Sequence, residues 1–169
     1  EQYKGQPGYE DIKTVFTIHN LKFQGQYDKI ITGDVLGLSG TPAEGQMLHE
    51  DAINYLQGAV IYCDMVTTVS PTYAQNICTP EYGEGLEGLF QSRSYKLKGI
   101  VNGIDYKEYN PRSDKNIVKN YGPATLEDKK ANKAKLQEML GLPVDENVPL
   151  FAMVTRMTAQ KGMDMVKYL

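Results

Sequence analysis

The stretch FAMVTRMTAQKGMD, residues 151–164, places two cations where an apolar run gives way to a helical pattern. Residues 150–154 are expected to form a buried strand that delivers Arg156 at its carboxyl end. The helix predicted after it would direct unpaired N–H groups and its positive dipole end toward the same place. Arg156 offers a planar fork for phosphate oxygens, Lys161 a mobile charge and Thr155 a hydroxyl donor. The stretch predicts a phosphate site in an α/β protein, and the competing interpretation is a pair of solvated charges.

Outward from this stretch, short apolar or β-branched runs alternate with helical patterns, which is typical of parallel α/β architecture. Besides the strand already named, strands are expected at residues 13–18, 65–69 and 97–101. These runs are continuously apolar rather than alternating. They therefore predict sheets that are covered on both faces.

The helical patterns carry recognisable start and stop signals. Helices are expected at residues 51–63, 71–78 and 126–140. Gly58 inside the first would cost about 1 kcal/mol relative to Ala, so it indicates a close helix contact. Ser70 and Pro71 are a typical N-cap and first helical residue, and Gly141 is a typical end for the third helix. The lysines of KKANKAK are interpreted as a solvated face, with a nucleic-acid or membrane role as the alternative.

Composition excludes several classes of protein. A chain of 169 residues with 41% hydrophobic residues can form one domain or parts of two. Its net charge of −3 argues against nucleic acid as a partner. No apolar run approaches the roughly 20 residues that span a membrane, and no signal peptide is visible. Cys63 and Cys78 are interpreted as free thiols of a cytoplasmic protein rather than a disulfide or metal site.

One glycine pattern is misleading. Gly83, Gly85 and Gly88 fit the G-x-G-x-x-G spacing of dinucleotide-binding turns, but that fingerprint requires a strand immediately before it. Glu84 and Glu87 would also repel a pyrophosphate. A loop that leads into a short helix is therefore favoured over a nicotinamide-binding site. An oxidoreductase that uses such a site stays as an alternative hypothesis.

Polar residues follow two of the expected strands. His19 and Asn20 follow residues 13–18, and ligands of α/β sheets collect at such strand ends. The alternative for His19 is a side chain that satisfies local backbone groups. Asn102 follows residues 97–101, and its alternative is a plain turn residue before glycine. His49 is expected to face solvent.

Five segments, in order along the chain, resemble bacterial glycogen synthases, the retaining transferases that extend α-1,4-glucans from ADP-glucose. They are TIHNLKFQG (17–25), DMVTTVSPTYA (64–74), EGLEGLF (84–90), GIVNGIDYKEYNP (99–111) and TRMTAQKGMD (155–164). The resemblance implies two Rossmann-like domains of the GT-B class facing a cleft. Residues 1–108 would be the later part of the acceptor-side domain, and residues 109–169 the start of the nucleotide-sugar domain.

The same resemblance suggests an internal piece of the enzyme, with sheets truncated at both ends. It lacks the family's Lys-x-Gly-Gly-Leu loop and its late acidic and Gly-rich segment. The alternative to an active synthase is therefore an inactive α/β fragment with at most weak nucleotide or glucan binding.

The resemblance also implies roles for single residues. Arg156 and Lys161 would grip the diphosphate, and His19 would lie against the transferred glucose in an orienting and charge-stabilising role. Substrate contacts are expected from Asn20, Tyr73, Asn102 and Thr155, although Tyr73 could equally be a core residue. No cofactor and no metal are expected, and bacterial-type similarity favours ADP-glucose over UDP-glucose. Gln57 replaces a lysine of the family pattern, and no catalytic role is attached to it.

Overall fold

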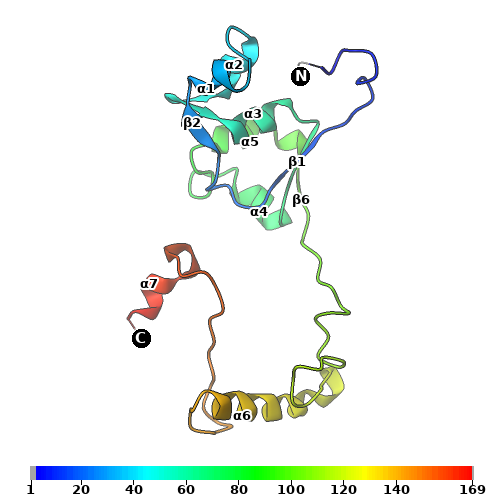
Figure 1. The fold of residues 1–169 in the computed structure, drawn as a ribbon, viewed down its shortest axis with the longest axis vertical. Coiled ribbons are helices and arrows are strands. Elements are labelled where there is room, and N and C mark those ends of the chain that lie inside the picture. The colour runs from blue at the N-terminus through cyan, green and yellow to red at the C-terminus, as the bar shows by residue number, and fades with distance from the viewer. Residues whose placement is uncertain (1–2, 169) are drawn as a thin grey trace. The chain divides into compact units, whose positions relative to one another are not determined.

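The computed structural model describes residues 3–168, and the chain divides into two compact units, Glu1–Gly103 and Ile104–Leu169. The first unit contains two small sheets and five α-helices (Figure 1). Its elements are β1 (Val15–Ile18), β2 (Gln26–Asp28), α1 (Ile31–Asp34), α2 (Pro42–Met47), β3 (Leu48–His49), β4 (Ala52–Asn54), α3 (Tyr55–Tyr62), β5 (Met65–Thr68), α4 (Pro71–Asn76), α5 (Glu87–Ser92), η1 (Ser94–Lys96) and β6 (Leu97–Gly99).

The predicted parallel sheet is present, with strand order β1-β5-β6. Ile18 pairs with Thr68, and Thr68 pairs with Gly99, so the three strands end in register at one edge. The prediction of cover on both faces is wrong for β1. Phe16 and Ile18 face the core, whereas Val15 is 63% exposed, because successive side chains of a strand point to opposite faces.

The helix expected at residues 51–63 begins later, at Tyr55. The preceding residues form β4, which pairs with β2 and β3 in an antiparallel sheet that the sequence did not reveal. Asn54 is completely buried, and its side-chain oxygen accepts from the N–H of Gln57 at 2.9 Å. This cap sets the helix start, since an N-cap residue satisfies a backbone donor that the helix cannot.

Two features of α3 and α4 agree with their sequence signals. A Cβ added at Gly58 would lie 2.7 Å from Cγ of Met47, so this glycine does mark a close contact, with α2. Ser70 caps α4 by accepting from the N–H of Tyr73 at 2.9 Å. Gln57 also has a structural role, because its Nε2 donates to the carbonyls of Gln46 and Leu48 at 2.8 and 2.7 Å.

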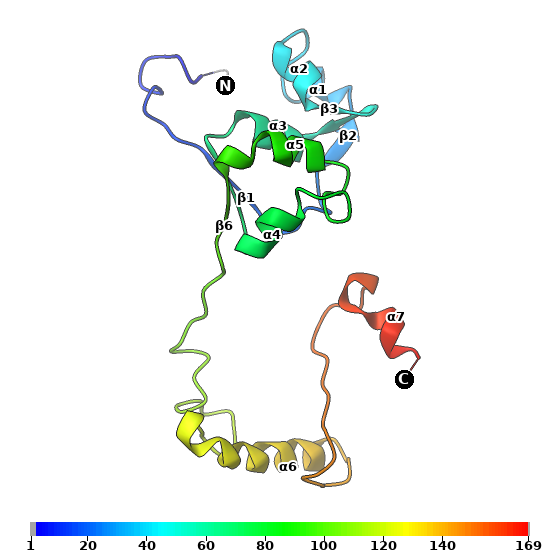
Figure 2. The ribbon, with the colours of Figure 1, turned by 180° about the vertical axis from the view of Figure 1, so that it is seen from behind.

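One hydrophobic core holds the parallel sheet against its helices. Helices α3 and α5 lie side by side in both views of the ribbon (Figures 1 and 2). The core is formed by residues from the strands, these helices and the loops between them: Ile18, Leu21, Leu56, Val60, Cys63, Val66, Ile77, Leu86 and Phe90. Leu21, in the loop after β1, is 0% exposed, so that loop is part of the core rather than a surface excursion.

The second unit consists mainly of turns and short helices. Its elements are η2 (Pro123–Asp128), α6 (Lys129–Met139), η3 (Ala159–Lys161) and α7 (Met163–Val166). Helix α6 is shorter than predicted because residues 123–128 wind as a 3-10 turn. Gly141 follows its end with φ +67°, the left-handed conformation expected of a helix-terminating glycine.

Three lysines of α6 (Lys129, Lys130 and Lys135) are exposed, Lys133 is half-buried, and several of them have local partners. Lys130 lies 2.8 Å from Glu127 and 3.7 Å from Glu146, and Lys133 donates to the carbonyl of Glu146 at 2.8 Å. These contacts fit the interpretation of a solvated face, because exposed ion pairs of this kind contribute little more than local order.

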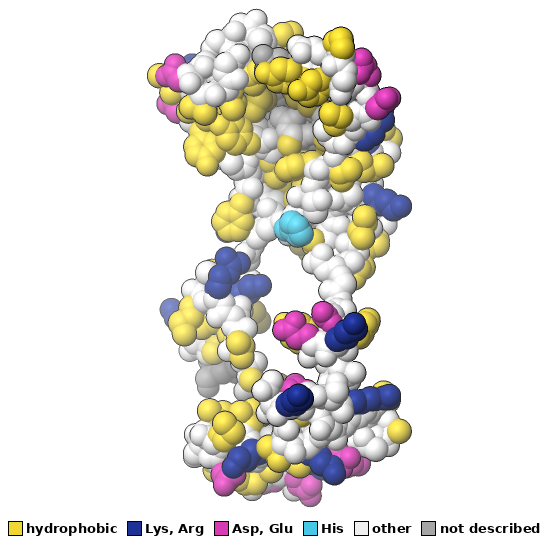
Figure 3. All heavy atoms as spheres, turned by 45° about the vertical axis from the view of Figure 1, so that its right-hand side comes forward, with side chains coloured by type: hydrophobic (Ala, Val, Ile, Leu, Met, Phe, Trp, Pro, Cys, Tyr) yellow, Lys and Arg dark blue, Asp and Glu magenta, His cyan; other side chains and the backbone are white. Residues whose placement is uncertain are grey.

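The strand predicted at residues 150–154 does not form. Phe151 and Val154 are 90% and 99% exposed. Other hydrophobic side chains also lie on the surface of both units (Figure 3). A strand needs a neighbour for its N–H and C=O groups. Among the described residues of the second unit no other segment is a strand, so this run has nothing to pair with.

Candidate active site

Three of the predicted site residues, His19, Asn20 and Tyr73, lie in or against the loop at the carboxyl edge of the parallel sheet. His19 follows β1 directly and is exposed. Parallel pairing places the ends of β1, β5 and β6 at the same edge, so the residues that follow each strand are neighbours in the fold. Open α/β sheets bind their ligands at this edge.

The loop after His19 is a tight turn. The side-chain oxygen of Asn20 accepts from the N–H of Lys22 at 3.1 Å, and its carbonyl accepts from the N–H of Phe23 at 3.3 Å. An Asn side chain that bonds two residues ahead imitates a backbone turn. Together with the buried Leu21, this turn anchors the loop that follows His19.

Tyr73 reaches this loop from α4. Its hydroxyl oxygen accepts from the N–H of Leu21 at 3.2 Å, and its ring packs partly buried against the core. Tyr73 therefore contacts the backbone of Leu21, two residues after His19 in the sequence. This packing agrees with the interpretation of Tyr73 as a core residue, and its contact with substrate stays a prediction.

Asn102 lies beyond the end of β6 and is exposed. Gly99, three residues earlier, packs so closely on the backbone of Ser70 and Pro71 that an added Cβ would overlap it. The segment after β6 therefore starts beside the amino end of α4.

The carboxylate of Asp105 accepts from the N–H groups of Lys107 and Glu108 at 2.8 and 3.2 Å, and these bonds lower its pKa.

Thr155, Arg156 and Lys161 lie together in the second unit. The N–H of Thr158 donates to the Arg156 carbonyl, and the N–H of Lys161 donates to the Thr158 carbonyl, both at 2.9 Å. Arg156 thus lies in the segment before η3 and Lys161 at the end of η3, and both are exposed, with no ion pair to either within residues 3–168. The predicted helix after the turn is only α7, so four residues supply little dipole to this place.

Gly83 and Gly85 lie in the turn before α5 and Gly88 lies inside α5, and the element before this turn is the helix α4 rather than a strand. This geometry lacks the strand that a dinucleotide-binding turn requires. His49, expected to face solvent, is instead half-buried, and a Cβ added at Gly85 would lie 3.5 Å from its Nε2.

A buried polar cluster near the His19 loop escaped the sequence analysis. Nε2 of Gln24 donates to the Glu84 carbonyl at 2.9 Å, and its Oε1 accepts from Nδ2 of Asn54 at 2.6 Å. An Asn before an apolar helical run is a capping signal that could have identified Asn54. Nothing local identifies the role of Gln24, because its partners Asn54 and Glu84 lie 30 and 60 residues away along the chain.

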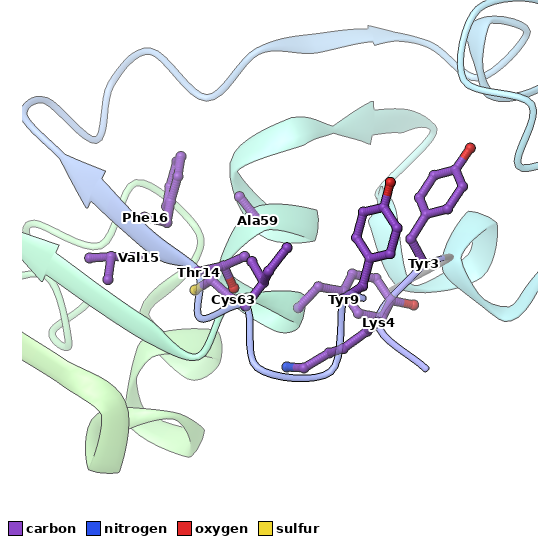
Figure 4. Close-up of a pocket in the computed structure, with 10 residues that line it drawn as sticks. Tyr3, Lys4, Tyr9, Thr14, Val15, Phe16, Ala59 and Cys63 are labelled. Atoms are coloured by element: carbon purple, nitrogen blue, oxygen red, sulfur yellow. The ribbon is translucent and has the colours of Figure 1, made fainter. Parts of the chain in front are cut away.

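A cavity of about 520 Å³ lies elsewhere, beside the N-terminal segment (Figure 4). The rings of Tyr3 and Tyr9 stand 5.8 Å apart at its border, and Val15 and Phe16 line it from β1. These residues are at the amino end and middle of β1, whereas His19 follows its carboxyl end. The cavity is therefore not the candidate site.

Three further observations concern metals, membranes and thiols. Within residues 3–168 no group of three or more His, Cys, Asp or Glu side chains is placed to hold a metal ion. In that same range, no helix has both the length and the apolar character needed to cross a membrane. Both cysteines are free thiols.

Comparisons with known proteins agree with the geometry. The family described as "Starch synthase catalytic domain" matches residues 1–92. The chain is 49% identical over 159 residues to the glycogen synthase of Clostridium beijerinckii, a match that covers 94% of this chain and 33% of that relative. The glycogen synthase of Exiguobacterium sibiricum is 46% identical over 164 residues, with coverages of 95% and 34%.

A solved structure has a similar fold. The catalytic domain of Starch Synthase IV from Arabidopsis thaliana, bound to ADP and acarbose, matches with a TM-score of 0.82 and 34% identity, covering 98% of this chain and 35% of that one. The fold is thus the Rossmann-like α/β fold of GT-B glycosyltransferases, as the sequence predicts. Within that class, the chain belongs to the family of starch synthase catalytic domains. It spans about a third of the length of the curated relatives it matches.

Proposed function

We propose that the full-length protein is a glycogen synthase, which transfers glucose from ADP-glucose to the 4-hydroxyl of an α-1,4-glucan with retention of configuration. The observation that carries this proposal is the similarity to glycogen synthases over at least 94% of the chain, which includes the strand ends that bear the candidate residues. No cofactor is part of the proposed reaction.

The first unit would face the glucan and hold the transferred sugar. His19, at the carboxyl edge of the sheet, would orient the glucose and stabilise charge that develops on it, while Asn20, Tyr73 and Asn102 line the same edge. Groups fixed before the reaction cost no reorganisation during it, so an anchored loop suits this role.

The second unit would hold the diphosphate. Arg156 and Lys161 carry positive charge before η3 and at its end, and Thr155 adds a hydroxyl group beside Arg156. A diphosphate leaving group gains negative charge as its bond to glucose breaks, so these cations would stabilise the transition state more than the ground state. In this proposal residues 1–108 belong to the acceptor-side domain and residues 109–169 to the nucleotide-sugar domain.

Calorimetric titration tests the diphosphate site. The chain is titrated with ADP, ADP-glucose and UDP-glucose, beside a variant that combines Arg156→Ala with Lys161→Ala. Saturable binding of ADP-glucose that this variant loses is the expected result, and tighter binding of ADP-glucose than of UDP-glucose would support the proposed donor.

A matched control combines Arg112→Ala with Lys115→Ala, which removes the same two charges from exposed positions in the same unit. Equal loss of binding in both double variants would contradict a specific diphosphate site. If the chain melts cooperatively but binds no nucleotide, the alternative of an inactive segment holds for these 169 residues, and the activity assay moves to the full-length protein.

A further inference from the structure

The side-chain amide of Gln24 joins three parts of the first unit, namely the loop after β1, the start of α3 and the turn before α5. Gln24 is 9% exposed, and its side chain uses both of its ends. Nε2 donates to the Glu84 carbonyl at 2.9 Å, while Oε1 accepts from Asn54 Nδ2 at 2.6 Å and from Gln26 Nε2 at 3.2 Å. A buried amide with this many partners is held in one orientation, because each lost bond would leave a buried polar group unpaired.

One partner fixes the loop to a helix start. Asn54, itself completely buried, caps α3 through its other side-chain atom. Backbone hydrogen bonds join the same two segments, since the Gln24 and Gly25 carbonyls accept from the N–H groups of Leu56 and Tyr55 at 3.0 and 3.1 Å. Gly25 has φ +65°, and a Cβ there would lie 3.3 Å from Cβ of Tyr55. The end of the loop is thus seated on the first turn of α3.

The other partner is a strained residue. Glu84 is one of two non-glycine residues in the described chain with positive φ, at +48°. Such a conformation costs free energy and persists only where its surroundings fix it. The bond from Gln24 to the Glu84 carbonyl is one contact that does so, and it links the His19 loop to the turn before α5.

The beginning of the same loop is anchored independently. Leu21 is completely buried, and its N–H donates to the Tyr73 hydroxyl at 3.2 Å. His19 and Asn20 precede this anchor, and Gln24 closes the loop five residues after His19. We propose that Gln24 is a positioning residue, which acts by joining the His19 loop to Asn54 and Glu84 and so sets where His19 stands at the sheet edge. This inference rests on the proposed function of His19.

Two substitutions separate this role from simple packing. Gln24→Glu keeps the size and the acceptor oxygens but replaces the donor with an oxygen that faces the Glu84 carbonyl. Asn54→Asp keeps the oxygen that caps α3 but replaces the donor to Gln24 with an oxygen. The control is Gln75→Glu, the same chemical change at an exposed position of α4.

The variants are made in the full-length enzyme, alone and combined with His19→Ala, and kcat and KM for ADP-glucose are measured. We expect Gln24→Glu and Asn54→Asp to lower kcat by up to about 10²-fold with little change in KM, since a displacement near 1 Å can have that effect. Gln75→Glu should match the wild type. In the His19→Ala background the two variants should cause no further loss, because they act through His19.

Thermal melting identifies any variant that fails to fold. If either Gln24→Glu or Asn54→Asp fails to fold, the kinetics of the other variant test the proposal. An equal loss of kcat with and without His19 would overturn the proposal, because it would mean that Gln24 acts through general packing. Full activity in both variants, while His19→Ala is impaired, would also overturn it. If His19→Ala itself leaves kcat unchanged, the role proposed for His19 fails first, and this inference fails with it.

Discussion

The N–H of Leu21 donates to the hydroxyl oxygen of Tyr73 at 3.2 Å, a bond that joins the loop after β1 to α4 across 52 residues of sequence. Both partners contact the hydrophobic core, and the bond lies two residues from His19. The candidate catalytic loop is therefore held in place by an uncharged pair, the backbone of Leu21 and the hydroxyl group of Tyr73.

Removing this bond should loosen the loop. Tyr73→Phe keeps the ring in the core but leaves the Leu21 N–H without its acceptor, so we expect a loss of about 0.5–1.5 kcal/mol in the free energy of unfolding. Chemical denaturation measures the loss, and hydrogen exchange should show a faster rate at the Leu21 amide. Tyr95→Phe, at a side chain that is 82% exposed, is the control. Equal stability of the two variants would contradict the anchoring role.

Lys96 should stabilise the end of α3. It is 7% exposed, and its Nζ donates to the carbonyls of Cys63 and Ile61 at 2.7 and 3.1 Å. Lys96→Met keeps most of the packing and removes the donor, so unfolding should become easier by about 1–3 kcal/mol in a denaturant titration. Lys98→Met, at the exposed neighbour on β6, should have little effect. A larger effect at Lys98 would show that the strand, rather than the helix end, is the sensitive element.

The fold should lose stability in acid partly through Asp64. Its carboxylate accepts from Nζ of Lys4 at 2.8 Å and from the N–H and hydroxyl of Thr14 at 2.8 and 3.0 Å, and these bonds hold its pKa well below the ordinary value of 3.8. A carboxyl group with a lowered pKa stabilises the folded state above its unfolded pKa. That contribution fades as the pH falls below about 4.

Melting temperatures across this range test the Asp64 prediction. Asp64→Asn should melt below the wild type at neutral pH, and the two curves should converge as the pH falls from about 5 toward about 2. Asp11→Asn, an exposed carboxylate of the same N-terminal segment, is the control. A gap between wild type and Asp64→Asn that stays constant with pH would exclude the carboxylate charge as the cause.

Gly99 should tolerate no side chain. A Cβ at this position would overlap the backbone of Ser70 and Pro71, which cannot move as the end of a flexible side chain can. Gly99→Ala is expected to cost about 1–3 kcal/mol, measured by denaturation, because the strand and the start of α4 must separate. Gly88→Ala, where nothing lies within 4 Å of the added carbon, should be neutral or slightly stabilising. Loss of stability at both glycines would indicate a backbone effect instead of the overlap.

Local signals in the sequence predicted the parts of the structure that depend on local physics. Ser70 and Pro71 mark the start of α4, Gly141 marks the end of α6, and the apolar runs at residues 13–18 and 65–69 mark paired parallel strands. In each case the chemistry of a few adjacent residues determines the outcome. Short segments of sequence likewise predicted the family, which comparison with glycogen synthases confirms.

Non-local pairing determined the rest. Residues 150–154 are as apolar as the other runs, but they form no strand because a strand exists only where another strand accepts its hydrogen bonds. The antiparallel sheet of β2, β3 and β4 was missed for the converse reason, since its strands of two or three residues have no periodicity to read. In the second unit, the helix predicted after Arg156 and Lys161 is only the four residues of α7.

By itself, the sequence determined the α/β class, the family and the residue types available at each strand end, because these depend on composition and on order along the chain. Only the tertiary structure decided which of those residues are held, and by what. Gln24 reaches Asn54 and Glu84, 30 and 60 residues away, to form the buried junction beside the His19 loop. Such a junction has no local signature, because it exists only when folding removes distant polar groups from water and leaves each as the other's partner.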